Sequence, residues 1–149
     1  MLNFVLSYAT GSTGLQAVVK LVMARHISTG NQGEDLACQW LRGRGFHILH
    51  RNWRAGRGEI DIVAREGAFL VVVEVKTRSS ALWGPPEQAV GPAKRRQLMR
   101  AATELQLTFP EDLELRFDVL SITHTPRGPE YVHIPNAFTP NGDAINDLF

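Results

Sequence analysis

The 149-residue sequence is short of cysteine, of aromatic side chains and of net charge. Its one cysteine, Cys38, excludes an internal disulfide framework and fits a reducing compartment, so we expect a cytoplasmic protein. Aromatic residues make up 8% of the chain and the formal net charge is +1, so these totals point to no particular partner. Hydrophobic residues at 44% and charged residues at 21% are typical of a folded globular chain and exclude a disordered one.

A long apolar run is also lacking. Residues 1–19 carry no charge, but the serines, threonines and glycines between positions 7 and 14 interrupt them well before the ~20 residues of a membrane span. No basic region precedes this stretch, which makes it a poor signal peptide. We therefore expect no membrane contact, a poorly ordered or weakly helical extension over residues 1–27, a domain over 28–138 and a tail over 139–149.

The charges that are present are unevenly spread. Residues 1–100 hold 14 lysines and arginines against 7 acids, whereas residues 101–149 hold 2 against 8. Such an asymmetry within one chain suggests that the basic part meets a polyanion.

Hydrophobic periodicity predicts an α/β domain. Helices are expected over residues 31–44 and about 92–108, the first ended by Gly43 and Gly45 and the second begun by Pro92. Strands are expected over 46–53, 59–65, 69–76, about 115–122 and 130–134. The order α-β-β-β-α-β-β predicts a central mixed β-sheet flanked by helices.

The second and third strands carry the most informative charges. A hairpin that turns about Gly67 places Ile62 opposite Val73 and Asp61 opposite Glu74. Side chains that face each other in this way have Cβ atoms ~4.5–5.5 Å apart, close enough for both carboxylates to hold one cation. The same alternation predicts Ile60 on the face of Ile62, opposite to the face that carries the acids.

Two facing carboxylates repel each other unless a positive charge compensates them. Mg²⁺ prefers oxygen ligands and binds one or two carboxylates together with waters and phosphates. Lys76 shares the face of Glu74 and could orient a water or stabilise charge on a phosphate. The alternative is a cross-strand ion cluster, in which Lys76 bridges Asp61 and Glu74 on a half-exposed sheet.

Three sets of residues in this order resemble a known superfamily: Gly30-x-x-x-Glu34, Gly58-Glu59-Ile60-Asp61 and Glu74-Val75-Lys76. They resemble the PD-(D/E)xK nucleases, which have the restriction-endonuclease-like fold. More closely, they resemble the small bacterial YraN family (UPF0102), relatives of archaeal Holliday-junction resolvases. The pattern covers roughly residues 30–138 and continues through Arg51-Asn52, Thr77-Arg78, Lys94, Arg116-Phe117-Asp118-Val119 and a final stretch from His133 to Phe138.

The resemblance implies a catalytic metal site. Asp61 and Glu74 would coordinate Mg²⁺ or Mn²⁺, with the main-chain carbonyl of Val75 as a further ligand, and Lys76 would act on the attacking water. Glu34 would reach the metal directly or through a water, although an acid in the first turn of a helix also stabilises the helix dipole on its own.

One further residue is suggested by the resemblance. Gln88 lies where related nucleases have a glutamine after the core motif, but Pro92 stands at the position of the tyrosine that follows it in some of them.

Basic residues around the first strand and on the second helix are candidates for binding nucleic acid. Lys94 and Arg95 lie in the first turn of a helix, where the dipole disfavours a cation by about 0.3–1 kcal/mol, and phosphate binding would explain their placement. A solvated charged face is the alternative interpretation. The full candidate set is Arg51, Arg54, Arg57, Arg78, Lys94, Arg95 and Arg96.

These observations predict a Mg²⁺-dependent endonuclease that acts on DNA in repair or recombination. The sequence has no recognition-helix or zinc-finger pattern, so cleavage directed by branched or junction structure is favoured over cleavage at a fixed sequence. A homodimer is compatible with the resemblance to resolvases. The alternative is a nucleic-acid-binding accessory module with a vestigial site. The presence of Asp61, Glu74 and Lys76 makes this alternative less favoured, because a degenerate nuclease usually loses the lysine or one of the acids.

Overall fold

The structure is a computed structural model that describes residues 16, 19, 30–79, 90–110 and 112–139. The chain divides into two compact units, Met1–Gln32 and Gly33–Phe149. In the first unit the described residues are helical. The second unit carries the rest of a helix over residues 30–42, the sheet and a second helix. Nearly all of the predicted extension and tail lie outside the described residues.

Five strands and helix α2 follow the first helix in the predicted order, and together they confirm the α/β class with a central mixed sheet flanked by helices. This arrangement is consistent with the restriction-endonuclease-like fold expected from the sequence. The elements are β1 (His47–Ala55), β2 (Gly58–Glu66), β3 (Phe69–Arg78), α2 (Pro92–Gln106), β4 (Glu114–Thr125) and β5 (Gly128–Phe138).

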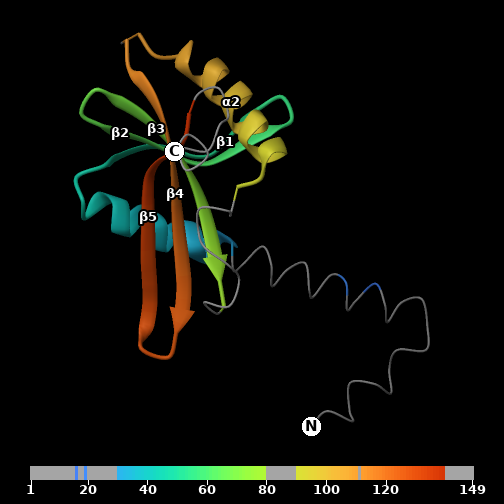
Figure 1. The fold of residues 1–149 in the computed structure, drawn as a ribbon, viewed down its shortest axis with the longest axis vertical. Coiled ribbons are helices and arrows are strands. Elements are labelled where there is room, and N and C mark those ends of the chain that lie inside the picture. The colour runs from blue at the N-terminus through green and yellow to red at the C-terminus, as the bar shows by residue number, and fades with distance from the viewer. Residues whose placement is uncertain (1–15, 17–18, 20–29, 80–89, 111, 140–149) are drawn as a thin grey trace, which may run out of the picture. The chain divides into compact units, whose positions relative to one another are not determined.

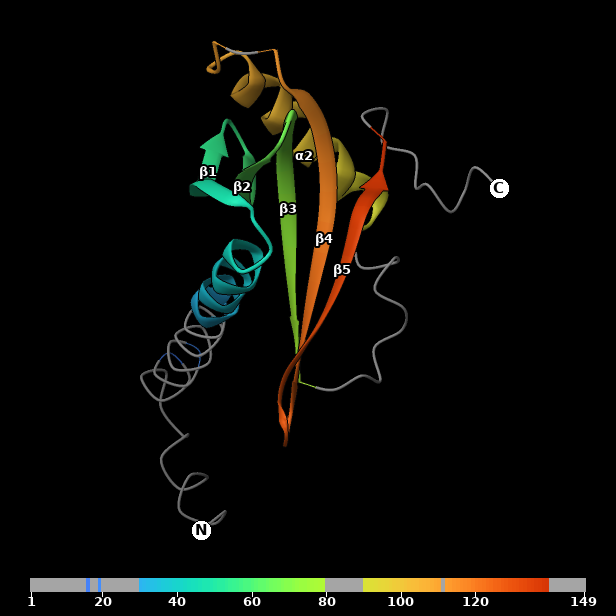
Figure 2. The ribbon, with the colours of Figure 1, turned by 90° about the vertical axis from the view of Figure 1, so that its left-hand side faces the viewer.

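The sheet has the strand order β1-β2-β3-β4-β5. Figure 1 shows β4 and β5 side by side, and in Figure 2 the labels β1 to β5 follow one another from left to right. Strands β3 and β4 are parallel, and the other neighbours are antiparallel. A parallel pair needs a crossover connection, and α2 lies between β3 and β4 in the sequence, where that crossover runs. Strand β3 is therefore a central strand, which explains its continuous apolar run from Leu70 to Val73.

Helices pack on both faces of the sheet, so the half-exposed sheet considered from the sequence is not what forms. Figure 2 shows the sheet between the first helix and α2. On one face the first helix buries Ala37, Cys38 and Leu41 against Val71, Val73, Leu120 and Ile122. On the other face α2 buries Leu98, Ala101, Ala102 and Leu105 against Val63, Leu70, Val72 and Phe117.

The first helix ends as the glycines predict. Gly45 has φ 88°, a left-handed conformation that costs glycine little. The Phe46 N–H donates to the Leu41 carbonyl at 3.2 Å, and the Gly45 N–H donates to the Arg42 carbonyl at 3.1 Å. These are the two hydrogen bonds of a Schellman motif, and Phe46 and Leu41 are buried in the same cluster. This turn sets the direction in which β1 leaves the helix.

One prediction for β2 is wrong. Ile60 packs in the cluster under α2, whereas Ile62 packs in the cluster under the first helix, so these two side chains do not share a face. The alternation breaks at Asp61. Across from it in β1 stands Asn52, between the residues that pair with Ile62 and Ile60, and Asn52 has φ 49°. A left-handed residue inside a strand bends and twists it locally, which turns the two isoleucines to different faces.

No helix in the described part of the chain is both long and apolar enough to cross a bilayer.

Candidate active site

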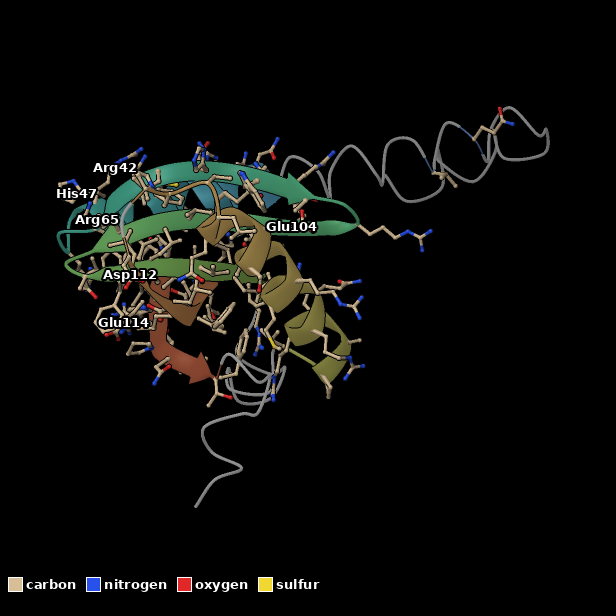
Figure 3. The ribbon with its side chains drawn as sticks, turned by 90° about the horizontal axis from the view of Figure 1, so that it is seen from above. Arg42, His47, Arg65, Glu104, Asp112 and Glu114 are labelled. Atoms are coloured by element: carbon tan, nitrogen blue, oxygen red, sulfur yellow. The ribbon has the colours of Figure 1, made fainter. Side chains whose placement is uncertain are left out.

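The candidate site lies at the end of the sheet where β2 begins and β3 ends. Asp61 is three residues into β2, and Glu74 and Lys76 are near the end of β3. The predicted register is confirmed at Ile62, which pairs with Val73. The ladder between β2 and β3 ends at this pair, so the predicted pairing of Asp61 with Glu74 is not part of it. Figure 3 shows the opposite end of the sheet, where the labelled His47, Arg65 and Glu114 gather.

Asp61 is bound to the backbone of the neighbouring strand. The Val75 N–H donates a hydrogen bond of 2.8 Å to its Oδ2. Burial raises the pKa of Asp61 to about 7, and the negative charges of Glu74 and Glu34 add to this effect, while the Val75 hydrogen bond opposes it. A carboxyl group in this setting ionises readily only when a cation compensates it.

Glu74 is 3% exposed and faces two ammonium groups. Lys76 Nζ donates to Glu74 Oε1 at 2.8 Å, and Lys94 Nζ forms an ion pair with Oε2 at 3.3 Å. Although Oε2 is buried, it has no hydrogen-bond partner among the described residues. A buried carboxylate oxygen without a hydrogen bond is costly, so this atom is the clearest sign of a position meant for another ligand.

Lys94 reaches this site from α2. Sequence reasoning placed it on a nucleic-acid-binding surface, and its position close to Glu74 follows only from how α2 packs on the sheet. Gly58 makes that packing possible, because a Cβ there would lie 3.1 Å from the Ala101 Cβ and 3.2 Å from the Gln97 carbonyl oxygen. The glycine of the Gly58–Asp61 motif is therefore explained by close contact with α2.

Glu34 is held beside the site by β1. The Asn52 side-chain amide donates to Glu34 Oε2 at 2.8 Å, and the Arg51 guanidinium lies 3.6 Å from the same oxygen. Arg51 also forms an ion pair with Asp35 at 2.8 Å. The left-handed conformation of Asn52 thus coincides with a hydrogen bond to a candidate metal-binding residue, a role for Asn52 that the sequence did not reveal.

The first helix approaches β3 closely at Gly33. A side chain on Gly33 would collide with the Thr77 hydroxyl, so glycine is required there. The motif read from the sequence began at Gly30, where a Cβ would meet nothing within 4 Å. The close contact beside Glu34 is therefore made by its direct neighbour Gly33, and the structure assigns no contact to Gly30.

Comparison with known proteins places these residues in a family. The model of the uncharacterised protein family UPF0102 matches residues 33–122. A UPF0102 protein of Geobacter metallireducens is 50% identical over 112 residues, which are 74% of this chain and 92% of that protein. One from Flavobacterium psychrophilum is 40% identical over 116 residues, 78% of this chain and 98% of that protein. The chain belongs to the UPF0102 family.

The matched span of the UPF0102 model contains every side chain described at the site so far. Glu34, Asp61, Glu74, Lys76 and Lys94 all lie between residues 33 and 122. A UPF0102 protein of Bacteroides thetaiotaomicron is 42% identical over 118 residues, which are 79% of this chain and 98% of that protein. The site is thus built within the part of the chain that defines the family.

The donor set of this UPF0102 chain fits a hard divalent cation that takes few side-chain ligands. Within residues 30–79, 90–110 and 112–139, no group of three or more His, Cys, Asp or Glu side chains is arranged to hold a metal ion. Two neighbouring carboxylates, one with a buried oxygen that lacks a hydrogen bond, match the sparse side-chain coordination of Mg²⁺.

The seven basic residues that are candidates for nucleic-acid binding differ in their contacts within the fold. Arg51 pairs with Asp35, Arg54 pairs with Glu59 at 3.4 Å, and Arg95 donates through Nε to the Val90 carbonyl at 2.8 Å. Arg51 and Arg95 thus contact other parts of the fold. Of the remaining candidates, Arg57 and Arg96 are exposed, Arg78 is half-buried at the end of β3, and Lys94 faces Glu74. Gln88 lies outside the described residues.

A second carboxylate, Asp118, was named from the sequence as part of the family pattern, but its burial and its partners were not predicted. Asp118 on β4 is 1% exposed and accepts hydrogen bonds from Arg116 and from His133. The signal was present as a run of alternating charges, Arg116 and Asp118, inside an apolar strand, because such charges persist there only when they are paired.

Proposed function

We propose that this chain is a Mg²⁺- or Mn²⁺-dependent endonuclease that hydrolyses phosphodiester bonds of DNA, directed by branched or junction structure, in repair or recombination. The observation that carries the proposal is the pair Asp61 and Glu74. One has a pKa raised to about 7 by burial and by its neighbour, and the other has a buried oxygen without a hydrogen bond. Both features are relieved by one divalent cation.

The residues that would hold the cation are the two carboxylates. Asp61 and Glu74 supply charged oxygens, and the resemblance to PD-(D/E)xK nucleases adds the Val75 carbonyl and, directly or through a water, Glu34. Asn52 supports this role of Glu34 because its amide fixes one carboxylate oxygen at 2.8 Å. A divalent cation bound here would polarise the phosphodiester as a Lewis acid.

Lys76 is the group suited to act on the attacking water. Its ammonium is anchored to Glu74 Oε1 and its side chain remains 33% exposed, so it meets solvent and the carboxylates at the same time. From this position it can orient a water molecule or stabilise negative charge on a phosphate oxygen.

The exposed arginines support a polyanionic substrate. Arg57 lies in the turn between β1 and β2, and this turn is next to α2, which carries Arg96. Phosphate contacts of this kind position a nucleic acid without reading its sequence, which agrees with cleavage directed by shape.

The test is a cleavage assay on four-way junction, flap and linear duplex DNA, with Mg²⁺, with Mn²⁺ and with chelator. Cleavage should require the metal and should disappear in Asp61→Ala and Lys76→Ala, while Lys76→Ala still binds DNA. Arg65→Ala, at the opposite end of the sheet, is the matched control that removes a positive charge and should cut normally.

Two results would contradict the proposal. Cutting that persists in Asp61→Ala or in chelator would remove the active-site assignment. Salt-dependent DNA binding without any cutting in either metal would favour the alternative, a nucleic-acid-binding module with a vestigial site.

A further inference from the structure

Two lysines from different elements share one buried carboxylate. Lys76 belongs to β3 and Lys94 to α2, and each side chain is 33% exposed beside a Glu74 side chain that is 4% exposed. Lys94 also acts on the neighbouring Asp61, whose raised pKa its positive charge partly lowers. The two lysines thus face two acids, which are the groups that a divalent cation would compensate in their place.

The two contacts are not equivalent. Lys76 makes a hydrogen bond of 2.8 Å to Oε1. Lys94 lies 3.3 Å from Oε2 as an ion pair, while Oε2 has no hydrogen-bond partner among the described residues. The ammonium of Lys94 is therefore the more easily displaced of the two, and it contacts the oxygen that is best placed for a metal.

The position of Lys94 on α2 favours a contact with a negatively charged group. It is the third residue of a helix whose N-cap, Gly91, makes no side-chain cap hydrogen bond and whose first turn holds no acid. A cation there is disfavoured by the helix dipole and needs a negative partner. Glu74 is that partner, and if it bound a divalent cation instead, Lys94 would be left facing the positive end of the helix.

The next residues along α2 do not share this position. Arg95 donates to the Val90 carbonyl and Arg96 is exposed. Among Lys94, Arg95 and Arg96, Lys94 is thus the residue that both contacts Glu74 and remains partly exposed to solvent.

We propose that Lys94 couples cation binding to phosphate binding: when a divalent cation engages Glu74 Oε2, the displaced ammonium binds a phosphate oxygen of the nucleic acid. This inference rests on the proposed function, because it assumes that Asp61 and Glu74 hold the cation. The coupling is reciprocal, so the cation tightens nucleic-acid binding and the nucleic acid tightens cation binding by the same factor.

The removal of the Lys94 charge has two opposite consequences. Cation binding becomes stronger, because a positive charge beside the site no longer opposes the incoming cation. The cation-dependent gain in nucleic-acid affinity becomes smaller, because the released ammonium is gone. A residue that served only the stability of the fold would produce neither change.

The experiment measures binding of a labelled four-way junction by fluorescence anisotropy, in chelator and in Ca²⁺, together with titration calorimetry of Ca²⁺ alone. The unchanged chain and Lys94→Gln are compared with Arg100→Gln, a matched loss of one exposed positive charge further along α2. We expect Ca²⁺ to tighten junction binding by about tenfold in the unchanged chain and in Arg100→Gln, and by less than about twofold in Lys94→Gln. Calorimetry should show tighter Ca²⁺ binding in Lys94→Gln.

Each other outcome has a distinct meaning. An unchanged Ca²⁺ gain in Lys94→Gln would overturn the inference and leave the proposed function intact. If the unchanged chain binds neither Ca²⁺ nor the junction, the proposed function itself fails. Lys94→Arg keeps the positive charge and should keep the Ca²⁺-dependent rise in junction affinity. If Lys94→Arg and Lys94→Gln both lose this rise, Lys94 has a structural role and the coupling is overturned.

Discussion

Two buried carboxylates lie side by side in the sheet and have opposite surroundings. Asp118 of β4 pairs with Val73 of β3, and Glu74 is the next residue along β3. Asp118 lies on the face covered by the first helix, because its register partner Val73 belongs to that cluster. Glu74 lies on the face of α2, where it meets Lys94.

Asp118 has all the partners that a buried carboxylate needs. Oδ1 accepts from Arg116 Nε and from the Asn136 N–H, both at 2.9 Å, and Oδ2 accepts from Arg116 at 2.9 Å and contacts His133 Nε2 at 2.9 Å. Burial alone would raise the pKa of Asp118, but the hydrogen bonds from His133, Arg116 and Asn136 outweigh burial and lower it.

Glu74 and its neighbour Asp61 lack part of the hydrogen bonding and charge compensation that Asp118 has. One oxygen of Glu74 lacks a hydrogen bond and the pKa of Asp61 is raised to about 7. The comparison teaches that burial of a carboxylate does not by itself mark function. A carboxylate whose oxygens are all bonded holds the fold together, whereas one that is left short of partners marks a site for a ligand.

The largest effect on stability is expected at Asp118. Arg116→Met leaves the buried carboxylate without its guanidinium and should lower the free energy of unfolding by about 3–5 kcal/mol. Urea denaturation measures this loss, with Arg65→Met as a control for removal of an arginine from a strand. A loss below about 1 kcal/mol would mean that Asp118 does not depend on Arg116.

Glu74→Gln is the matched test on the other face. It should change the free energy of unfolding by less than about 1 kcal/mol, because it removes a charge that repels Asp61 and keeps an oxygen that can accept from Lys76. In the same variant cleavage should fall by at least about 100-fold, since one charged metal ligand is lost. If Glu74→Gln destabilised the protein as much as Arg116→Met, Glu74 would be a structural carboxylate like Asp118, which would contradict the comparison.

Asp61, the acid beside Glu74, and Asp118 should also differ in how pH affects stability. The folded-state pKa of Asp61 is about 7 against an ordinary 3.8, so its contribution is full below the ordinary value and is lost as the pH rises towards 7. Asp118 has a lowered pKa, so its contribution is present above the ordinary value and is lost as the pH falls through the folded-state value.

Thermal unfolding in chelator between pH 4 and pH 8 measures this difference. Asp61→Asn should abolish most of the decline in melting temperature towards neutral pH, and Mg²⁺ at pH 8 should raise the melting temperature of the unchanged chain but not of Asp61→Asn. An identical decline in both proteins would show that Asp61 does not carry it.

The smallest effect is expected at Asn52. Asn52→Gly keeps the left-handed backbone without strain and removes the amide that holds Glu34, so the melting temperature should barely change. Mg²⁺ affinity should fall by about tenfold, the lower end of the cost of losing one outer-shell hydrogen bond. When combined with Glu34→Gln, it should add nothing further, and full additivity would show that Asn52 acts elsewhere.

Much of the fold follows from local pattern. The apolar run of β3, the turn at Gly67 and the alternation around Ile62 suffice to pair Ile62 with Val73, because a slip of one residue would turn every side chain to the wrong face. The ends of the first helix and of α2 follow from Gly45 and Pro92. Within β2 the alternation failed at Asp61, opposite the left-handed Asn52, and register shifts also interrupt β1 at Ile48/His50 and β4 at Phe117/Val119.

The candidate site was predictable only in part. Asp61, Glu74 and Lys76 lie on two strands joined by a short turn, so the hairpin brings them to the same end of the sheet. The strand period alone does not place Asp61, because the alternation breaks there and the β2–β3 ladder ends at Ile62. Lys94 comes from a crossover helix and Asn52 from a bent position in β1, and no periodicity reports the angle at which those elements pack. For the same reason, the sequence could not tell that Arg51 and Arg95 have partners within the fold.

The sequence by itself thus determined the order of the elements, the register of the central hairpin and the three charged residues that it carries, because these depend on neighbours close along the chain. The tertiary structure alone decided which buried carboxylate is fully bonded. Arg116, His133 and Asn136 converge on Asp118, while Glu74 receives Lys76 and a looser Lys94, and that difference depends on how strands and helices from distant parts of the chain pack together.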